Sequence, residues 1–184
     1  MRIATFARCA ALLACTCASP ASAQAPDNPL SAHARFMYSG IKLWLLGAAE
    51  KMPAEYYSFE PTEEVRTFGQ MIGHVADGQY RFCSIVIGEK NPTPNIEATK
   101  TGKTDLIAAL KAAFVYCDRA YDGLTDATAT DMLKVGPGMP KLGVLTVNNL
   151  HSTLHYGNLI TYLRLKHIVP PSSDPAYLPQ PPKK

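Results

Sequence analysis

The chain has 184 residues, of which 47% are hydrophobic and 18% are charged, and its formal net charge is only +3. This length and apolar content suit one domain with an adequate core. A nucleic-acid binder would show a concentrated basic face, so the nearly balanced charge argues against a nucleic-acid partner.

The N-terminal residues are typical of an export signal. Positive charge from two arginines accompanies a run of apolar and small residues from Cys9 to Ala18, and Ala21-Ser22-Ala23 matches an A-x-A cleavage site. We therefore predict that residues 1–23 are a signal peptide, that the mature protein begins at Gln24, and that it is exported to a bacterial periplasm.

A lipoprotein is the alternative, because Leu12-Leu13-Ala14-Cys15 resembles a lipoprotein box and would make Cys15 a lipidated anchor. The apolar run of the leader is shorter than the ~20 residues that span a bilayer, and no later apolar stretch of that length lacks polar residues. We therefore expect no transmembrane anchor.

The rest of the chain contains four long segments with the apolar spacing of helices and no convincing strand alternation. Thr67 and Gln70 form a capping box at the start of the second segment, and prolines end the first and the last. The predicted helices are residues 30–52, 67–88, 104–121 and 142–167. We predict an all-α four-helix bundle over residues 24–171 and a flexible Pro-rich tail over residues 172–184.

Three of the five cysteines fall in the leader, which leaves Cys83 and Cys117. Cys83 is nine residues after His74. At ~100° per residue this puts the two on opposite sides of the helix, so Cys83 faces away from that histidine. Cys117 falls on the apolar seam of its helix. We predict from this phase that the two cysteines are not joined in a disulfide, although a Cys83 that faces the third helix would leave a bridge open.

The histidines carry the chemistry of this sequence. His151 and His155 are four residues apart on one predicted helix, where neighbouring Cβ atoms lie about 5–6 Å apart, so both imidazoles can bind one metal ion. His74, on another predicted helix, supplies a third imidazole. A three-histidine site leaves at least one coordination position open for water or substrate. Ser152 stands where the H-E-x-x-H motif has its glutamate, which excludes a zinc peptidase.

The surroundings of the histidine pair are less specific. Val147, Leu150 and Leu154 follow the 3-4 spacing of a buried face, so we expect His151 and His155 to border that face. The simpler interpretation is a pair of partly buried histidines that hydrogen-bond to their neighbours without a metal.

Two polar residues are candidates for orienting the ligands. Asp77 and Asn148 each lie three positions from the nearest predicted ligand, and either can orient an imidazole by a hydrogen bond. An ordinary solvated helix residue is the alternative for each. The remaining histidines, His33 and His167, do not share the metal face.

The chain resembles the DinB/YfiT-like family of four-helix metalloproteins over nearly the whole mature region. The resemblance rests on Thr67 to Asp77 (TFGQMIGHVAD), His151 to Gly157, Tyr162-Leu163-Arg164 and Ile168-Val169-Pro170-Pro171. In that family the metal ligands are one histidine of the second helix and an H-x-x-x-H pair of the last helix. The resemblance therefore implies that His74, His151 and His155 bind one divalent metal ion.

The resemblance also implies a range of functions. Family members include thiol-dependent transferases and metal-dependent hydrolases, and dimers are common among them, so a homodimer is one assembly to consider. Export conflicts with a cytosolic thiol transferase, because small thiols are not kept reduced outside the cytosol. We expect an exported metal-dependent hydrolase or transferase that uses Zn²⁺ or Ni²⁺ on a small molecule of unknown identity. A non-catalytic metal- or ligand-binding bundle and a purely structural bundle are the alternatives.

Overall fold

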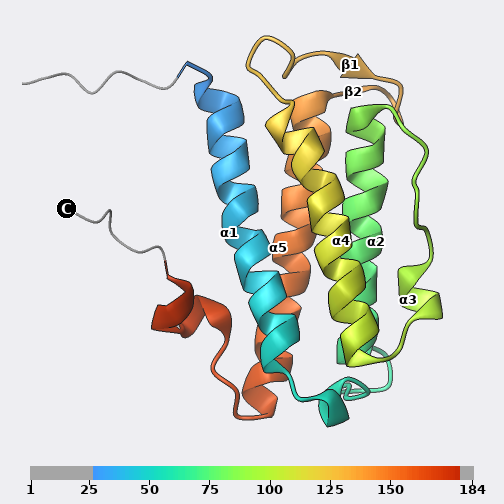
Figure 1. Ribbon diagram of the computed structural model, residues 1–184, viewed down its shortest axis with the longest axis vertical. Helices are drawn as coiled ribbons and strands as arrows, with labels where there is room; N and C mark the ends of the chain where they lie inside the picture. Colours follow the sequence, from blue (N-terminus) through green and yellow to red (C-terminus); the bar gives the residue numbers. More distant parts are fainter. Residues whose placement is uncertain (1–26, 179–184) are drawn as a thin grey trace, which may run out of the picture.

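The computed structural model describes residues 27–178, and within them long α-helices form an all-α bundle (Figure 1). The long helices are α1 (Pro29–Lys51), α2 (Phe68–Ile87), α4 (Lys103–Asp122) and α5 (Lys141–Leu165). Both α1 and α2 pack against α4 and α5, so the order around the bundle is α1, α4, α2, α5. The predicted fold class is confirmed.

The leader lies outside the described residues, and so do Cys15 and the last six residues of the chain. The predicted signal peptide and its lipoprotein alternative therefore stay predictions. Across the part of the chain that the structure describes, no helix has both the length and the apolar content that crossing a membrane requires.

The start of α2 is fixed by its own sequence. The Thr67 hydroxyl accepts a hydrogen bond from the backbone N–H of Gln70 (3.2 Å), and the Gln70 side chain accepts one from the backbone N–H of Thr67 (2.8 Å). This reciprocal pair satisfies two N–H groups that a helix start leaves free, as the sequence predicts. Gly88 follows the last residue of α2 with a φ of 81°, a left-handed conformation that glycine adopts without strain. Local interactions thus fix both ends of the helix that carries His74.

The face that α5 buries differs from the predicted one. Leu150 and Leu154 are 64% and 65% exposed, so the prediction that they mark the buried face is wrong. The buried side chains of α5 instead include the polar Asn148, Ser152 and His155. Asn148 and Ser152 hydrogen-bond to one glutamine of α2, which lets these polar side chains lie on the buried face of α5.

Short elements interrupt the connections between the helices. The first, α3 (Ile96–Thr99), lies between α2 and α4 and packs against α2. Two short strands, β1 (Met132–Leu133) and β2 (Met139–Pro140), pair antiparallel between α4 and α5. Of these elements α3 bears on the site, because it brings Glu97 to the surface of α2.

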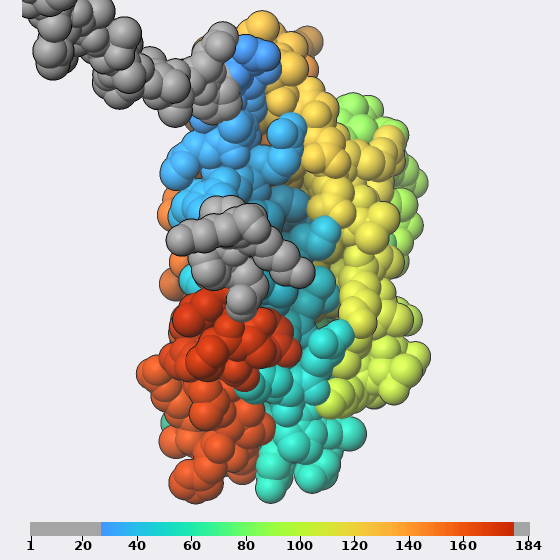
Figure 2. All heavy atoms as spheres, turned by 60° about the vertical axis from the view of Figure 1, so that its left-hand side comes forward, coloured from blue at the N-terminus to red at the C-terminus, as the bar shows by residue number. Residues whose placement is uncertain are grey.

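The segment after α5 lies against α1 as far as the structure describes it (Figure 2). It consists of the 3₁₀ turns η2 (Pro171–Ser173) and η3 (Pro175–Tyr177). Asp174 forms an ion pair with Lys51, and the ring of Tyr177 covers Gly47, leaving no space for a side chain there. Residues 172–178 of the predicted tail thus lie against α1, and the flexibility of the tail stays a prediction. Proline content limits regular structure in this segment, but it does not prevent docking on a glycine of another helix.

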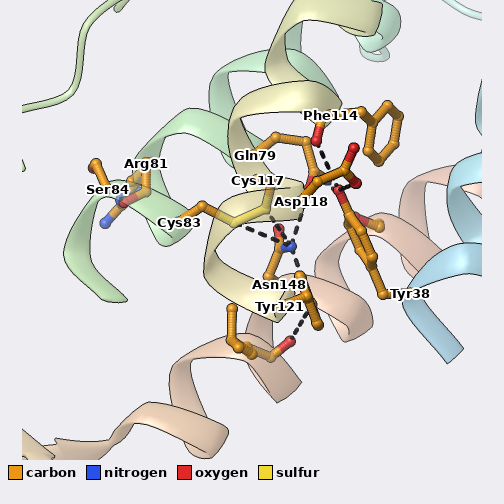
Figure 3. Close-up of a disulfide and its surroundings, with 12 residues drawn as sticks. Tyr38, Gln79, Arg81, Cys83, Ser84, Phe114, Cys117, Asp118, Tyr121 and Asn148 are labelled. Atoms are coloured by element: carbon orange, nitrogen blue, oxygen red, sulfur yellow. Dashed lines mark hydrogen bonds between the residues drawn. A yellow bond between two sulfur atoms is a disulfide. The ribbon is translucent and has the colours of Figure 1, made fainter. Parts of the chain in front are cut away.

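Cys83 of α2 and Cys117 of α4 form a disulfide in the buried centre of the bundle (Figure 3). Their Cα atoms are 5.1 Å apart, which is within the range that a disulfide requires. The prediction that the two cysteines stay unpaired is wrong. Cys83 and His74 do lie on opposite sides of α2, as predicted. Cys83 faces α4, however, whereas His74 faces α5.

Candidate metal centre

Three histidines from two helices meet between α2 and α5. His74 lies on α2, and His151 and His155 lie one turn apart on α5. One ring nitrogen of each lies within 4.8 Å of the others, and the Nε2 atoms of His74 and His151 are 3.1 Å apart. Two nitrogen ligands of a tetrahedral zinc ion, each ~2.1 Å from it, lie roughly 3.4 Å apart. The arrangement therefore fits one divalent ion with only small shifts of the rings.

The ring of His151 lies directly against the backbone of α2 at Gly78. A Cβ atom at position 78 would be 2.5 Å from Cε1 and 2.8 Å from Nδ1 of this imidazole. Real Cβ atoms do not approach other atoms so closely, so any side chain there would displace the ring. Gly78 is thus a requirement of the cluster, and the sequence contains it four residues after His74.

His74 is oriented by a carboxylate from α3. Its Nδ1 atom is 2.9 Å from Oε2 of Glu97, and the other carboxylate oxygen, Oε1, accepts a hydrogen bond from Nε of Arg66 (2.7 Å). Because a carboxylate accepts, Nδ1 carries the proton and the lone pair of Nε2 faces the other two imidazoles. A carboxylate behind a histidine in this way fixes the ring and increases its strength as a metal ligand.

Two residues of α2 hold Glu97 in place. The carboxylate of Asp77 accepts hydrogen bonds from the backbone N–H groups of Ile96 (2.8 Å) and Glu97 (2.9 Å). Gly73 permits the close approach, because a Cβ atom there would be 2.7 Å from Cα of Glu97. Within residues 27–178 Asp77 makes no hydrogen bond to an imidazole, contrary to the predicted one. Asp77 acts on His74 indirectly, by fixing the segment that carries Glu97.

Asn148 lies on the side of the bundle where the disulfide is found (Figure 3). It is fully buried, and its amide nitrogen donates to the side chain of Gln79 (3.0 Å) and lies 3.3 Å from the hydroxyl of Tyr121. Gln79 in turn donates to the hydroxyl of Ser152 (2.8 Å). Among the described residues Asn148 makes no hydrogen bond to an imidazole. Its contacts join α2, α4 and α5 and do not orient His151 in the predicted way.

Burial keeps two of the imidazoles neutral. Removal from water and then the nearby histidines lower the pKa of His151 to about 4, and burial followed by His74 lowers the pKa of His155 to about 4. At neutral pH both rings therefore offer the lone pair that a metal ligand needs. The Nδ1 atoms of both are buried without a hydrogen-bond partner within residues 27–178. Neighbouring side chains within the described residues therefore do not hold these two Nδ1 atoms by hydrogen bonds.

A cavity of about 720 Å³ lies beside the cluster and reaches His155. Its walls come from the connection before α2, the first turns of α2, α3 and the second half of α5. Polar and charged residues in the lining include Glu64, Arg66, Gln70, Glu97 and Asn158. Small-molecule sites usually occupy about 300–1,000 Å³. An ion held by the histidines would therefore face a space of the size of a small molecule.

The structure brings together the three histidines that the sequence singles out and leaves the other two elsewhere. His33 is exposed on α1, and His167 lies just after α5 with a φ of 57°. The sequence does not reveal Glu97 or Arg66, because both fall in predicted connections without helical periodicity. Gly73 and Gly78, on either side of His74, are a signal that points to close approach by other segments.

Solved structures of other proteins share this architecture. The family sequence model of the DinB superfamily matches residues 45–159. A solved DinB-like protein from Bacillus cereus ATCC 10987 is 14% identical, with a TM-score of 0.66 over 74% of this chain and 92% of that one. A DinB-like protein from Bacillus subtilis is 20% identical, with a TM-score of 0.60 over 76% and 92% of the two chains.

A third solved structure, a conserved protein from Enterococcus faecalis, is 14% identical and has a TM-score of 0.57 over 78% of this chain and 98% of that one. No curated protein matches the sequence. At these identities the structural likenesses show the fold alone. The family match covers more than half of the chain, including all three histidines, and the chain therefore belongs to the DinB superfamily.

Proposed function

We propose that this protein binds one divalent metal ion through His74, His151 and His155 and uses it as a metal-dependent hydrolase or transferase. The observation that carries the proposal is the cluster itself, in which three imidazoles, two of them with a pKa lowered to about 4, converge beside a cavity of about 720 Å³. Imidazole ligands suit both Zn²⁺ and Ni²⁺, so the ligand set does not distinguish these two ions. When bound, such an ion would supply Lewis acidity to a substrate oxygen or sulfur, or lower the pKa of a water molecule.

The residues around the cluster have distinct parts in this proposal. Glu97 holds the proton of His74 on Nδ1, which leaves Nε2 free for the ion. Gly78 allows His151 to reach the same point. His155 joins the cluster to the cavity, so a substrate in the cavity would meet the ion on that side.

A non-catalytic metal-binding bundle is the second candidate. It is favoured by the lowered pKa values of two carboxylates in the cavity lining. Burial alone would raise the pKa of Glu97, but hydrogen bonds from Arg66 and His74 outweigh it and lower the pKa. A hydrogen bond with Thr62 lowers the pKa of Glu64. Carboxylates with lowered pKa values are weak general bases and weak general acids near neutral pH. An enzyme here would therefore depend on the ion more than on either carboxylate.

We also propose that the protein is exported, with cleavage after Ala23. The buried disulfide between Cys83 and Cys117 supports this, because disulfides persist in oxidising compartments such as the periplasm. It also favours a hydrolase over a transferase that needs a reduced thiol. N-terminal sequencing of the native protein tests the proposal, and an unprocessed Met1 would contradict it.

Elemental analysis of protein purified without an affinity tag tests the metal site, followed by a hydrolase screen with and without chelator. We expect about one equivalent of ion per chain, lost in His74→Ala, His151→Ala and His155→Ala variants that keep their helical circular dichroism. His33→Ala and His167→Ala are the matched controls and should keep the ion. Turnover that disappears with chelator supports the enzyme, and bound metal without turnover supports the binding bundle. Stoichiometric metal in the triple histidine variant would overturn the assignment of the ligands.

A further inference from the structure

Arg66 is a fixed cation in the lining of the cavity. Its backbone carbonyl accepts a hydrogen bond from the hydroxyl of Tyr162 (2.6 Å), and its Nε donates to Glu97 (2.7 Å). It directly precedes Thr67, which caps α2. Both the main chain and the guanidinium are therefore held before any ligand binds, which reduces the entropy that binding would cost.

The outer edge of this guanidinium is free to bind a ligand. The hydrogen bond to Glu97 uses only Nε, and within residues 27–178 the two terminal nitrogens of Arg66 make no hydrogen bond. The side chain is 42% exposed and lines the cavity. Two parallel N–H groups on such an edge match the two oxygens of a carboxylate or a phosphate.

The guanidinium and the proposed ion lie close together. One carboxylate, that of Glu97, contacts both Arg66 and His74. The formal charges of Glu64, Arg66 and Glu97 in the lining amount to one negative charge, which a divalent ion would turn into one positive charge. Glu64 is exposed, so water screens its repulsion of an anion more than that of a buried group. The cavity therefore favours an anion once the metal is bound.

We propose that the cavity binds small molecules that carry an anionic group, and that Arg66 binds this group while the reacting atom faces the metal. The inference rests on the proposed metal site, because the ion supplies the net positive charge. Other polar residues in the lining, among them Gln70, Asn158 and Thr161, carry no formal charge and do not oppose it. Arg66 is thus a residue that selects the substrate and sets its orientation.

Two hydroxamates test this proposal with Co²⁺-loaded protein, whose visible spectrum reports ligands on the ion. Acetohydroxamate binds through the metal only, whereas the monohydroxamate of succinate carries an additional carboxylate. We expect wild-type protein to bind the succinate compound roughly tenfold more tightly, the value of one charge-assisted contact. For each variant we compare the ratio of the two affinities. Both compounds bind the same ion, so a change in metal binding affects both affinities alike and leaves their ratio unaltered.

Arg66→Met should reduce the ratio to about one, and Arg66→Lys should retain part of it because the charge remains while the paired N–H groups are lost. Arg81→Met is the matched control. Arg81 stacks over Phe82, which contacts the ring of His151, but it does not line the cavity. This variant removes the same charge near the cluster and should keep the wild-type ratio.

Each outcome is informative. A ratio near one in the wild type, or an unchanged ratio in Arg66→Met, overturns the assignment of Arg66 and leaves the metal site standing. Failure to bind Co²⁺ overturns the proposed function itself. If Arg66→Met does not fold, as judged by circular dichroism, Arg66→Lys decides, because an undiminished ratio there contradicts recognition by the guanidinium.

Discussion

The carboxylate of Glu97 lies 2.9 Å from Nδ1 of His74, although twenty-three positions separate the two residues in the chain. This contact determines which nitrogen of His74 faces the other imidazoles. It exists because Asp77 and Gly73 hold α3 against α2. Metal affinity should therefore depend on residues that do not touch the ion.

Replacement of Glu97 by glutamine or alanine should weaken metal binding roughly 10- to 100-fold, as loss of the partner of a ligand histidine does elsewhere. Glutamine keeps an acceptor but loses the charge, so its effect should be the smaller one. Titration calorimetry with Zn²⁺ measures both. Glu64→Gln removes one charge from the same cavity without a contact to His74 and is the control. Equal affinities for all four proteins would show that Glu97 has no part in the site.

Gly78→Ala should push the ring of His151 away from α2 and lower metal affinity at least about tenfold, since one of three ligands is displaced. The overpacking should also destabilise the fold by about 1–3 kcal/mol. Gly157→Ala is the matched control on α5, because a Cβ atom there meets nothing within 4 Å. That variant should keep its metal and gain about 0.5–1 kcal/mol from the higher helix propensity of alanine. Metal titration and denaturant unfolding distinguish the two effects, and unaltered metal binding in Gly78→Ala would refute the close contact.

Protein that lacks residues 1–23 should show no free thiol when it is denatured without reductant, because Cys83 and Cys117 are paired. A double replacement of both by serine should cost about 2–4 kcal/mol, mainly because the unfolded chain is no longer cross-linked. Thiol titration and urea unfolding measure these effects, and reduced wild-type protein provides the comparison. Two titratable thiols per chain in freshly isolated protein would contradict the pairing.

Alkaline pH should unfold the protein because of buried tyrosines. Burial raises the pKa of Tyr38, and Asp118 adds to this; burial also raises the pKa of Tyr57 and Tyr121. A group with a folded-state pKa above its unfolded value of ~10 stabilises the fold below that pH, and the contribution is lost as the pH rises further.

Absorbance of phenolate and far-UV circular dichroism, recorded together from neutral to strongly alkaline pH, check this expectation. The buried tyrosines should ionise only as the helical signal falls. Replacement of Tyr38 by phenylalanine removes one such group. It should therefore reduce the phenolate absorbance that appears while the helical signal falls. Complete ionisation near pH 10 with an unchanged helical signal would contradict the burial of these hydroxyls.

The sequence by itself determined the helical segments, the capping box before α2 and the three histidines, because each follows from spacing within one helix or from a local hydrogen-bond pattern. The family resemblance supported the assignment of His74 as the third ligand beside the pair on α5. Apolar spacing misjudged the buried face of α5, since Leu150 and Leu154 are as regularly spaced as core residues and yet lie on the outside.

Only the tertiary structure decided which segments meet. The approach of Glu97 to His74, the pairing of Cys83 with Cys117 and the docking of residues 172–178 on α1 all depend on the path of connections that have no periodic signal. Small residues such as Gly47, Gly73 and Gly78 permit these approaches. In the sequence a glycine indicates that a neighbour can come close, but the neighbour itself is chosen by the packing of the whole bundle.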